Sequence, residues 1–191
     1  MNRQQLYHAI RAAGAIAAVD RVIIVGSQSI LGSFHIDQLP AITHLSAEVD
    51  VMPDVDDFDL MVQLSDLIEG VAGELSSFEA LHGFALDGVD LTTSVLPLGW
   101  RDRLVVVSNE FTRDPVSGKQ YTGLCLDPAD LCVAKLCAGR EKDRAFVTAL
   151  FAARLVDPAV VWERLQNMPT EHTEIAALVL AEHARQHESD G

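Results

Sequence analysis

Glu48 and Asp50, two carboxylates separated by one valine, are the residues of this sequence best suited to bind a metal ion. Segment 47–52 alternates polar and apolar residues as a half-buried strand does. Side chains two apart on a strand share a face, so both carboxylates point the same way while Val49 and Val51 face the core. Mg²⁺ typically takes one or two carboxylates and leaves its other positions to water and phosphates. The alternative is a solvated acidic face, since the chain carries 28 acidic residues.

A glycine and a serine, Gly26 and Ser27, follow the short apolar segment 21–25. That segment is β-branched and stops at the glycine, which predicts a buried strand running into a turn and a short helix over 27–34. Glycine lets a ligand approach the backbone, and a helix N-terminus offers unpaired N–H groups to a phosphate. The alternative is an ordinary strand-to-helix turn.

The densest basic cluster in the chain contains Lys135, Arg140 and Lys142. The two lysines are seven residues apart, so they share one face if a single helix continues past Gly139. The alternative is a helix surface whose basic residues pair with the neighbouring acidic ones.

The remaining pattern alternates helices and strands and then becomes helical. Helical spacing predicts helices over 3–19 and over about 58–74. The expected core face of the second helix is Leu60, Leu64, Leu67, Ile68 and Val71. Segments 82–91 and 103–107 are predicted strands, and 109–123, rich in Gly, Pro, Asp and Ser, is a predicted loop or hairpin.

Three helix starts are predicted in the last third of the chain. Asp127 precedes Pro128, with Asp130 three residues beyond the cap, and Asp157–Pro158 repeats the pattern. Thr170 is a further predicted cap. The sequence thus predicts an α+β fold in one compact unit: an α/β catalytic half, residues 1–124, and a helical half, residues 125–191, packed on it.

Composition limits the functions that remain. The net charge of −14 opposes broad DNA or other non-specific nucleic-acid binding, which needs a basic face. No apolar run approaches the roughly 20 residues that cross a bilayer, and the N-terminal segment is interpreted as an amphipathic helix of a cytoplasmic protein. Cys125, Cys132 and Cys137 are an odd number without metal-site spacing, so we expect buried, reduced thiols.

The order of these motifs resembles the nucleotidyltransferase superfamily: an apolar strand, Gly-Ser, a helix, and then two acidic residues on the next strand. More narrowly, the chain resembles bacterial minimal nucleotidyltransferase-like proteins related to abortive-infection and type IV-like toxins. Their downstream K-L-x-A-x-R-x-K-D motif matches residues 135–143. The resemblance covers roughly 22–155 and includes segment 96–104.

The resemblance implies a mixed five-stranded sheet, flanked by helices, with the active site at one edge. Gly26 and Ser27 would bind the triphosphate of an NTP, while Glu48 and Asp50 would hold Mg²⁺ or Mn²⁺. The basic cluster, with Lys135 as its catalytic member, would contact phosphates or the acceptor. The acceptor hydroxyl would belong to RNA, including tRNA, to a protein or to a small molecule, and a cognate antitoxin is an expected partner.

Two features depart from the family pattern. Twenty residues separate Ser27 from Glu48, more than is usual, so loop 35–45 is expected to bulge out. The third metal ligand is also ambiguous, because Asp87 and Asp90 both follow at suitable distance. Three residues apart on a strand, they face opposite sides, and we favour Asp90 because apolar residues flank it as they flank Asp50. Without a third carboxylate, the protein would bind nucleotide or serve as a regulatory module without transferring a nucleotidyl group.

Overall fold

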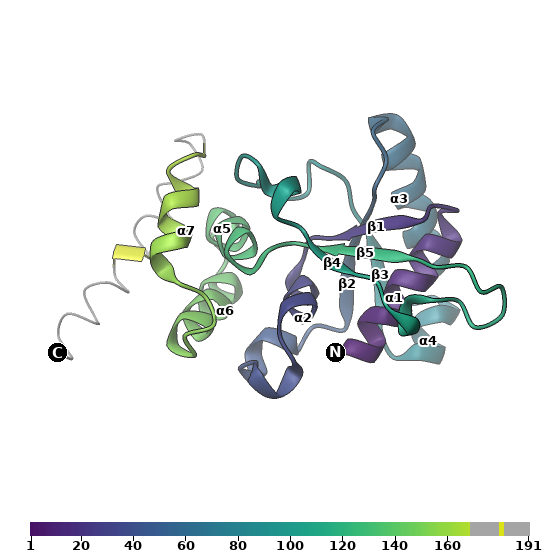
Figure 1. Ribbon diagram of the computed structural model, residues 1–191, viewed down its shortest axis with the longest axis horizontal. Coiled ribbons are helices and arrows are strands. Elements are labelled where there is room, and N and C mark those ends of the chain that lie inside the picture. Colours follow the sequence, from purple (N-terminus) through teal and green to yellow (C-terminus); the bar gives the residue numbers. More distant parts are fainter. Residues whose placement is uncertain (169–179, 182–191) are drawn as a thin grey trace.

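The computed structural model describes residues 1–168 and 180–181, and its centre is one mixed β-sheet (Figure 1). The five strands are, in spatial order, β3 (Ala85–Gly88), β2 (Glu48–Pro53), β1 (Arg21–Ile24), β5 (Thr122–Cys125) and β4 (Val105–Val107). β1 pairs antiparallel with β2 and parallel with β5, β2 pairs parallel with β3, and β4 pairs antiparallel with β5. This sheet with its flanking helices confirms the predicted α+β fold.

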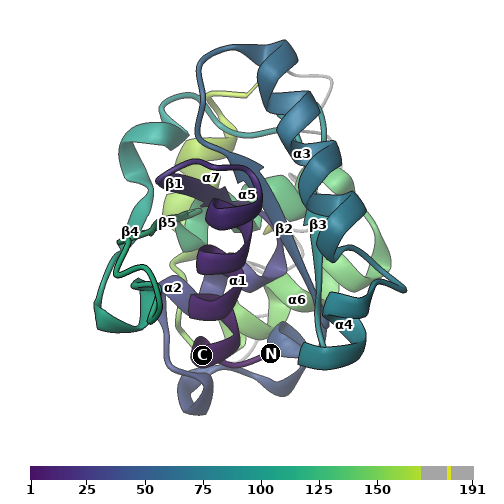
Figure 2. The ribbon, with the colours of Figure 1, turned by 90° about the vertical axis from the view of Figure 1, so that its right-hand side faces the viewer.

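Two helices cover one face of the sheet, α1 (Arg3–Ile16) and α3 (Phe58–Ala72), and the short α4 (Ser77–His82) follows α3 (Figures 1 and 2). Asn2 caps α1 by accepting a hydrogen bond from the backbone N–H of Gln5. The buried residues of α1 recur at helical spacing and pack on the alternate residues of β1 and β2 that face them. Helix α1 therefore begins and packs where the sequence predicts.

The predicted core face of α3 is correct at Ile68, which is buried, and at Leu64, which packs partly buried against the core, and it is wrong at Leu60, Leu67 and Val71. Its buried residues are Met61, Ser65, Ile68 and Ala72, whereas Leu60, Leu67 and Val71 are exposed. The buried residues repeat at spacings of four, three and four, and so does the row Leu60, Leu64, Leu67 and Val71, so helical periodicity alone does not choose between the two rows. The contact of α3 with β2 and β3 makes the choice.

Neither β5, which lies inside and after the expected loop, nor α4 was predicted. Gly123 lies in β5 and lowers its strand signal, because glycine is depleted in strands. The packing explains this glycine, since a Cβ at Gly123 would lie 2.4 Å from the Cδ1 atom of Ile10. Because α1 approaches the sheet closely here, position 123 must be glycine. Glycine weakens the residue pattern from which a strand is predicted.

The C-terminal helices α5 (Pro128–Ala138), α6 (Glu141–Ala152) and α7 (Pro158–Leu165) lie at the opposite end of the molecule from α3 and α4 (Figure 1). Asp127 and Asp157 cap α5 and α7, as predicted, by accepting hydrogen bonds from the N–H groups of Ala129 and Ala159. Thr170 lies outside the described residues.

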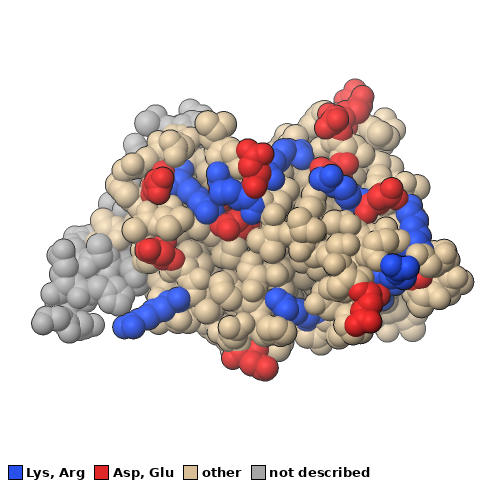
Figure 3. All heavy atoms as spheres, in the orientation of Figure 1, with Lys and Arg blue, Asp and Glu red and all other residues tan. Residues whose placement is uncertain are grey.

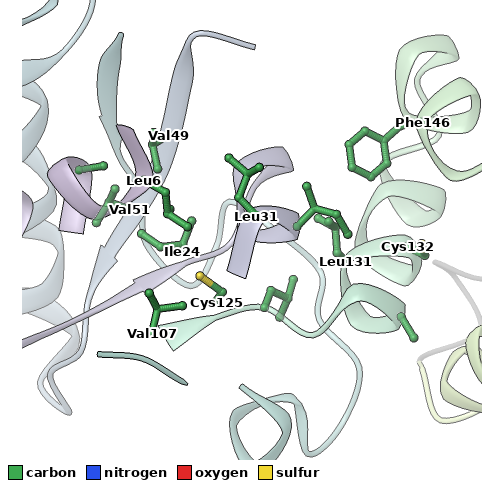
Figure 4. Close-up of a cluster of buried hydrophobic side chains, with 14 of the residues drawn as sticks. Leu6, Ile24, Leu31, Val49, Val51, Val107, Cys125, Leu131, Cys132 and Phe146 are labelled. Atoms are coloured by element: carbon green, nitrogen blue, oxygen red, sulfur yellow. The ribbon is translucent and has the colours of Figure 1, made fainter. Parts of the chain in front are cut away.

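One hydrophobic cluster joins the sheet to these helices (Figure 4). It extends from Ile24 of β1 through Leu31 of α2 (Ile30–Ser33) to Leu131 of α5 and Phe146 of α6. Cys125 and Cys132 are fully buried in it, and burial raises the pKa of both thiols. No helix within the described residues is long and apolar enough to cross a membrane.

A buried ion-pair network also joins the two parts. Asp130, fully buried on α5, accepts hydrogen bonds of 2.9 and 3.0 Å from Arg103 and lies 3.0 Å from Arg164 of α7. Arg103 ends a 3₁₀ helix (Trp100–Arg103) that leads into β4, and Arg164 also pairs with Asp127. Figure 3 shows basic and acidic side chains side by side on this face, near α5 and α7. Asp130 therefore connects three segments and does not cap α5.

Candidate active site

A pocket of about 680 Å³ lies between the β2–β3 side of the sheet and helices α5 and α6. Drug-sized ligands occupy cavities of roughly 300–1,000 Å³, so a nucleotide fits this volume. Its lining includes most of the residues that the sequence singled out: Gly26, Ser27, Glu48, Asp50, Asp87, Lys135, Arg140 and Lys142.

Two carboxylates from neighbouring strands form one wall of the pocket. In the parallel register of β2 and β3, Asp50 is paired with Asp87, and Val49 is paired with Leu86. Val49 and Leu86 are fully buried in the main core, so the aspartates project from the opposite face of the sheet, into the pocket. Glu48 lies on the same face at the exposed start of β2.

The pKa of Asp50 is raised to about 6, first by burial and then by the negative charge of Asp87. Lys135 acts in the opposite direction, Glu48 raises the pKa further, and Arg140 lowers it. A carboxyl group in this position holds a proton more readily than usual. A cation beside Asp50 and Asp87 would relieve the same repulsion.

Gly26 is required here by the close approach of Asp50. A Cβ at Gly26 would lie 1.2 Å from the Oδ2 atom of Asp50. The φ of Gly26 is −82°, which other residues adopt, so backbone conformation does not explain the glycine. Ser27 begins a 3₁₀ helix (Ser27–Ser29), which runs into α2. The turn thus brings backbone and carboxylate together at the pocket wall.

The opposite wall carries the basic residues, arranged around a buried aspartate. Asp143 of α6 is 1% exposed and accepts a 2.9 Å hydrogen bond from the Nζ atom of Lys135 and another from Nε of Arg140. Burial alone would raise the pKa of Asp143, but these hydrogen bonds lower it below its usual value. Lys135 also lies 4.5 Å from the ring centre of Phe146. Its charge is therefore fixed in place at the edge of the pocket.

Lys135 and Lys142 do not share a helix face, because the single helix past Gly139 that a shared face required does not form. Gly139 adopts a φ of 68° and ends α5, and α6 starts at Glu141 in a new direction. Lys135 is buried, whereas Lys142 is exposed and has no ion pair with any described residue. Both line the pocket because the corner at Gly139 brings the start of α6 back to it.

The structure brings Asp87, and not Asp90, to the pocket. β3 ends at Gly88, so the alternation on which the choice of Asp90 depended does not reach that residue. The carboxylate of Asp90 accepts hydrogen bonds from the N–H and hydroxyl of Thr92, which lower its pKa. Asp90 caps a turn and does not line the pocket.

Sequence analysis did not identify two loop segments that line the pocket: Ile42, Thr43, Leu45 and Ser46, and Thr93, Ser94 and Val95. The first segment belongs to the long insertion between Ser27 and Glu48, which contains 3₁₀ helices at Ile36–Gln38 and Ala41–His44. The second of these 3₁₀ helices contacts α6. The unusual length of the insertion was the sequence feature that pointed to the first segment. The insertion forms a wall of the pocket instead of bulging out from it.

No group of three Asp, Glu, His or Cys side chains among the described residues is already close enough to hold a metal ion. The donor set at the pocket is thus the pair Asp50 and Asp87, with Glu48 nearby. Such a pair suits Mg²⁺, which needs one or two carboxylates when phosphates supply further oxygens. The fit of a divalent cation rests on this pair and on the raised pKa of Asp50.

Comparison with known proteins gives one match. The family described as nucleotidyltransferase of unknown function (DUF6036) matches residues 4–188. No curated protein and no solved structure is significantly similar to the chain. The matched range includes both walls of the pocket and nearly the whole sequence, so this chain is a member of the DUF6036 family of nucleotidyltransferases.

Proposed function

We propose that this protein transfers a nucleotidyl group from an NTP to a hydroxyl group of RNA, a protein or a small molecule, with a divalent cation held at Asp50 and Asp87. The observation that carries the proposal is the pairing of these two carboxylates in one register, beside Gly26 and Ser27 and across the pocket from a basic wall. The family match supports the reaction class.

The carboxylates share one role in this proposal, which is to bind the cation. A divalent cation, Mg²⁺ or Mn²⁺, would neutralise the phosphates and polarise the reacting phosphorus. Asp50 and Asp87 would bind that cation, and Glu48 would complete the set by turning inward from its exposed position. Asp87 takes the place that the sequence pattern favoured for Asp90, because β3 brings Asp87 next to Asp50.

The basic wall would bind and orient the triphosphate. Arg140 has a side chain that is 62% exposed, and Lys142 has no ion pair among the described residues, so both are free to turn toward phosphate oxygens. Lys135 is held by Asp143, so it would stabilise charge near Asp50 without moving. The exposed apolar side chains of Ile42 and Leu45 offer a surface for the nucleobase.

A second function is favoured by the absence of a preformed group of three ligands among the described residues. In that case the fold binds a nucleotide without transferring it and serves as a regulatory module, for example in a toxin–antitoxin pair. The antitoxin, an RNA acceptor such as tRNA and a cytoplasmic location are implied by the resemblance and stay predictions.

The test is incubation with each labelled NTP, Mg²⁺ or Mn²⁺, total RNA and protein extract. Asp50→Asn and Asp87→Asn should each lower transfer by about two orders of magnitude or more, because positioned charge supplies most of the catalysis. Asp90→Asn is the matched control and should transfer as the wild type does. Equal losses in Asp90→Asn and Asp87→Asn would refute the ligand assignment.

Thermal stability in the presence of ligand separates the two functions. A cation with an NTP should raise the melting temperature of the wild type by mass action, and this shift should vanish in Asp50→Asn. Binding without transfer to any acceptor would favour the regulatory module. A shift that survives in Glu48→Ala/Asp50→Ala would refute both functions at this site.

A further inference from the structure

Gln28 is a buried polar residue directly after the Gly26–Ser27 turn, and it does not itself line the pocket. It is 1% exposed, and its Nε2 atom donates a 3.1 Å hydrogen bond to the carbonyl oxygen of Ser46, eighteen residues further along the chain. Because this partner is an acceptor, only the NH₂ end of the amide can face it, which fixes the orientation of the side chain. Gln28 thus connects the turn to a distant segment that does line the pocket.

The segment that receives this hydrogen bond is residues 35–46, which we call the insertion loop (below α2 in Figure 1). Its apolar side chains at the pocket give it little support, since Ile42 and Leu45 are 41% and 73% exposed. Thr43 is buried, but its hydroxyl donates a hydrogen bond to the carbonyl of Pro40 inside the same loop. The position of the loop therefore depends on contacts from other segments.

Among the described residues, two hydrogen bonds from other segments reach residues 39–46. One runs from the amine of Met1 to the carbonyl of His44, and the other runs from Gln28 to Ser46. Ser46 is also bonded to the first residue of β2, because its Oγ atom accepts a 3.1 Å hydrogen bond from the N–H of Glu48. Gln28 therefore holds the end of the loop that continues into β2.

The other end of the Gln28 amide has no partner. Its Oε1 atom is buried and accepts no hydrogen bond from any described residue. A buried acceptor without a donor destabilises the folded state, whereas an apolar side chain of similar shape does not carry this cost. Stability alone therefore does not explain a glutamine at position 28, while its link to the pocket wall does.

We propose that Gln28 is a positioning residue for the nucleotide, because it holds the insertion loop against the Gly26–Ser27 turn. This inference rests on the proposed function, in which the nucleobase contacts Ile42 and Leu45 of the loop. Gln28 fixes these two side chains relative to the turn, beside which the phosphates bind. A loop that is held in place before binding loses less conformational freedom when the ligand arrives, which strengthens binding.

The first test is Gln28→Met, which keeps the length of the side chain and removes both polar atoms. The KM for the NTP should rise about tenfold while kcat changes by less than about twofold, since the variant loses binding in the ground state and the transition state alike. Its melting temperature without ligand should equal or exceed that of the wild type. The unpaired Oε1 atom is gone, and Ser46 is partly exposed, so its carbonyl can bind water instead.

The matched control is Gln38→Met, the same substitution at an exposed position of the same loop. The Oε1 atom of Gln38 accepts a 2.9 Å hydrogen bond from the N–H of His35, so it makes a contact within the loop and not to the turn. This variant should keep the KM of the wild type. Gln28→Leu, with a smaller side chain, is the second variant if Gln28→Met melts at a lower temperature.

Hydrogen exchange of the full chain without ligand measures the link independently of any activity. The N–H groups of Thr43 and Glu48 report on the loop, because they donate to Pro40 and to the Oγ atom of Ser46. In Gln28→Met their exchange should be about tenfold faster or more, while the amides of β1 and β5 exchange as in the wild type.

Three outcomes would overturn the proposal. The first is unchanged exchange at Thr43 and Glu48 in Gln28→Met, and the second is faster exchange with an unchanged KM. The third is a lower melting temperature in both Gln28→Met and Gln28→Leu, because the glutamine would then serve stability. A wild type that neither binds nor transfers a nucleotide would refute the proposed function as well, and this result differs from all three.

Discussion

At the scale of single residues, the close approach of the Asp50 carboxylate to the backbone at Gly26 shapes one wall of the pocket. The carboxylate of Asp50 occupies the space where any other residue at position 26 would place its Cβ. The backbone at Gly26 would tolerate alanine, so the effect of a substitution there isolates this contact.

Gly26→Ala should abolish the cation-dependent and NTP-dependent rise in melting temperature. The added methyl group displaces the Asp50 carboxylate, at a cost of about 1–3 kcal/mol in the free energy of unfolding. Gly70→Ala is the matched control, because nothing lies within 4 Å of a Cβ at that position of α3. It should stabilise the protein by about 0.5–1 kcal/mol and leave the ligand-dependent shift intact. Normal ligand binding by Gly26→Ala would contradict the proposed role of this contact.

The raised pKa of Asp50 predicts a pH dependence of stability. In the folded state this pKa rises from 3.8 to about 6, so the folded protein binds the proton more tightly than the unfolded chain does. The contribution to stability is therefore full below pH 3.8 and is lost as the pH rises through about 6. At higher pH the ionised Asp50 destabilises the metal-free protein on the order of 2–3 kcal/mol.

Asp50→Asn should accordingly be more stable than the metal-free wild type at about pH 8, and the difference should shrink toward about pH 4. Urea denaturation of both proteins across this range measures it. A difference that is constant with pH would show that Asp50 does not titrate as described. Addition of Mn²⁺ should reverse the order at about pH 8, because only the wild type binds the cation.

At the scale of secondary-structure elements, the ends of α5 determine what faces the pocket. Asp127 begins the helix and Gly139 ends it, so Lys135 points at Asp143 and the start of α6 returns to the pocket. Asp127 has two roles, since it caps α5 and also pairs with Arg164 of α7.

Two substitutions at Asp127 separate these roles. Asp127→Asn keeps a capping oxygen and loses the ion pair, whereas Asp127→Ala loses both. Alanine should therefore cost about 1 kcal/mol more than asparagine in the free energy of unfolding. Neither change should alter the affinity for NTP, because Asp127 does not line the pocket. Equal stability of the two variants in urea denaturation would show that the cap contributes nothing.

At the scale of the whole molecule, the pocket exists only while the sheet and the C-terminal helices stay together. The main hydrophobic cluster includes residues of both, and Asp130 joins Arg103 to Arg164 across them. The net charge of −14 leaves the basic wall of the pocket as a local exception in an acidic molecule.

Asp130→Asn should lower the free energy of unfolding by about 3–5 kcal/mol, since it leaves two partly buried arginines without their shared carboxylate. Far-ultraviolet and near-ultraviolet circular dichroism should still report one coincident transition if residues 1–124 and 125–191 fold as one unit. Two separated transitions in the wild type would contradict that expectation. Asp114→Asn, a change in the exposed loop before β5, is the control and should cost little.

The sequence was informative where structure depends on local pattern. Strand alternation placed Glu48 and Asp50 on the face opposite to Val49 and Val51, and helix caps at Asp127 and Asp157 stand where their residue types indicate. It was less informative where segments meet. The strand β5 was missed because Gly123 makes room for Ile10, and the helix α4 was missed before β3.

The sequence by itself determined the fold class, the Gly26–Ser27 turn and the two carboxylates of β2, because each follows from spacing within one short segment. Only the tertiary structure decided that Asp87 and not Asp90 stands beside Asp50, since that depends on the register of β2 with β3 and on the end of β3 at Gly88. Only packing on the sheet decided which apolar row of α3 is buried. These choices depend on contacts between residues far apart in the chain, and the local pattern is equally compatible with either outcome.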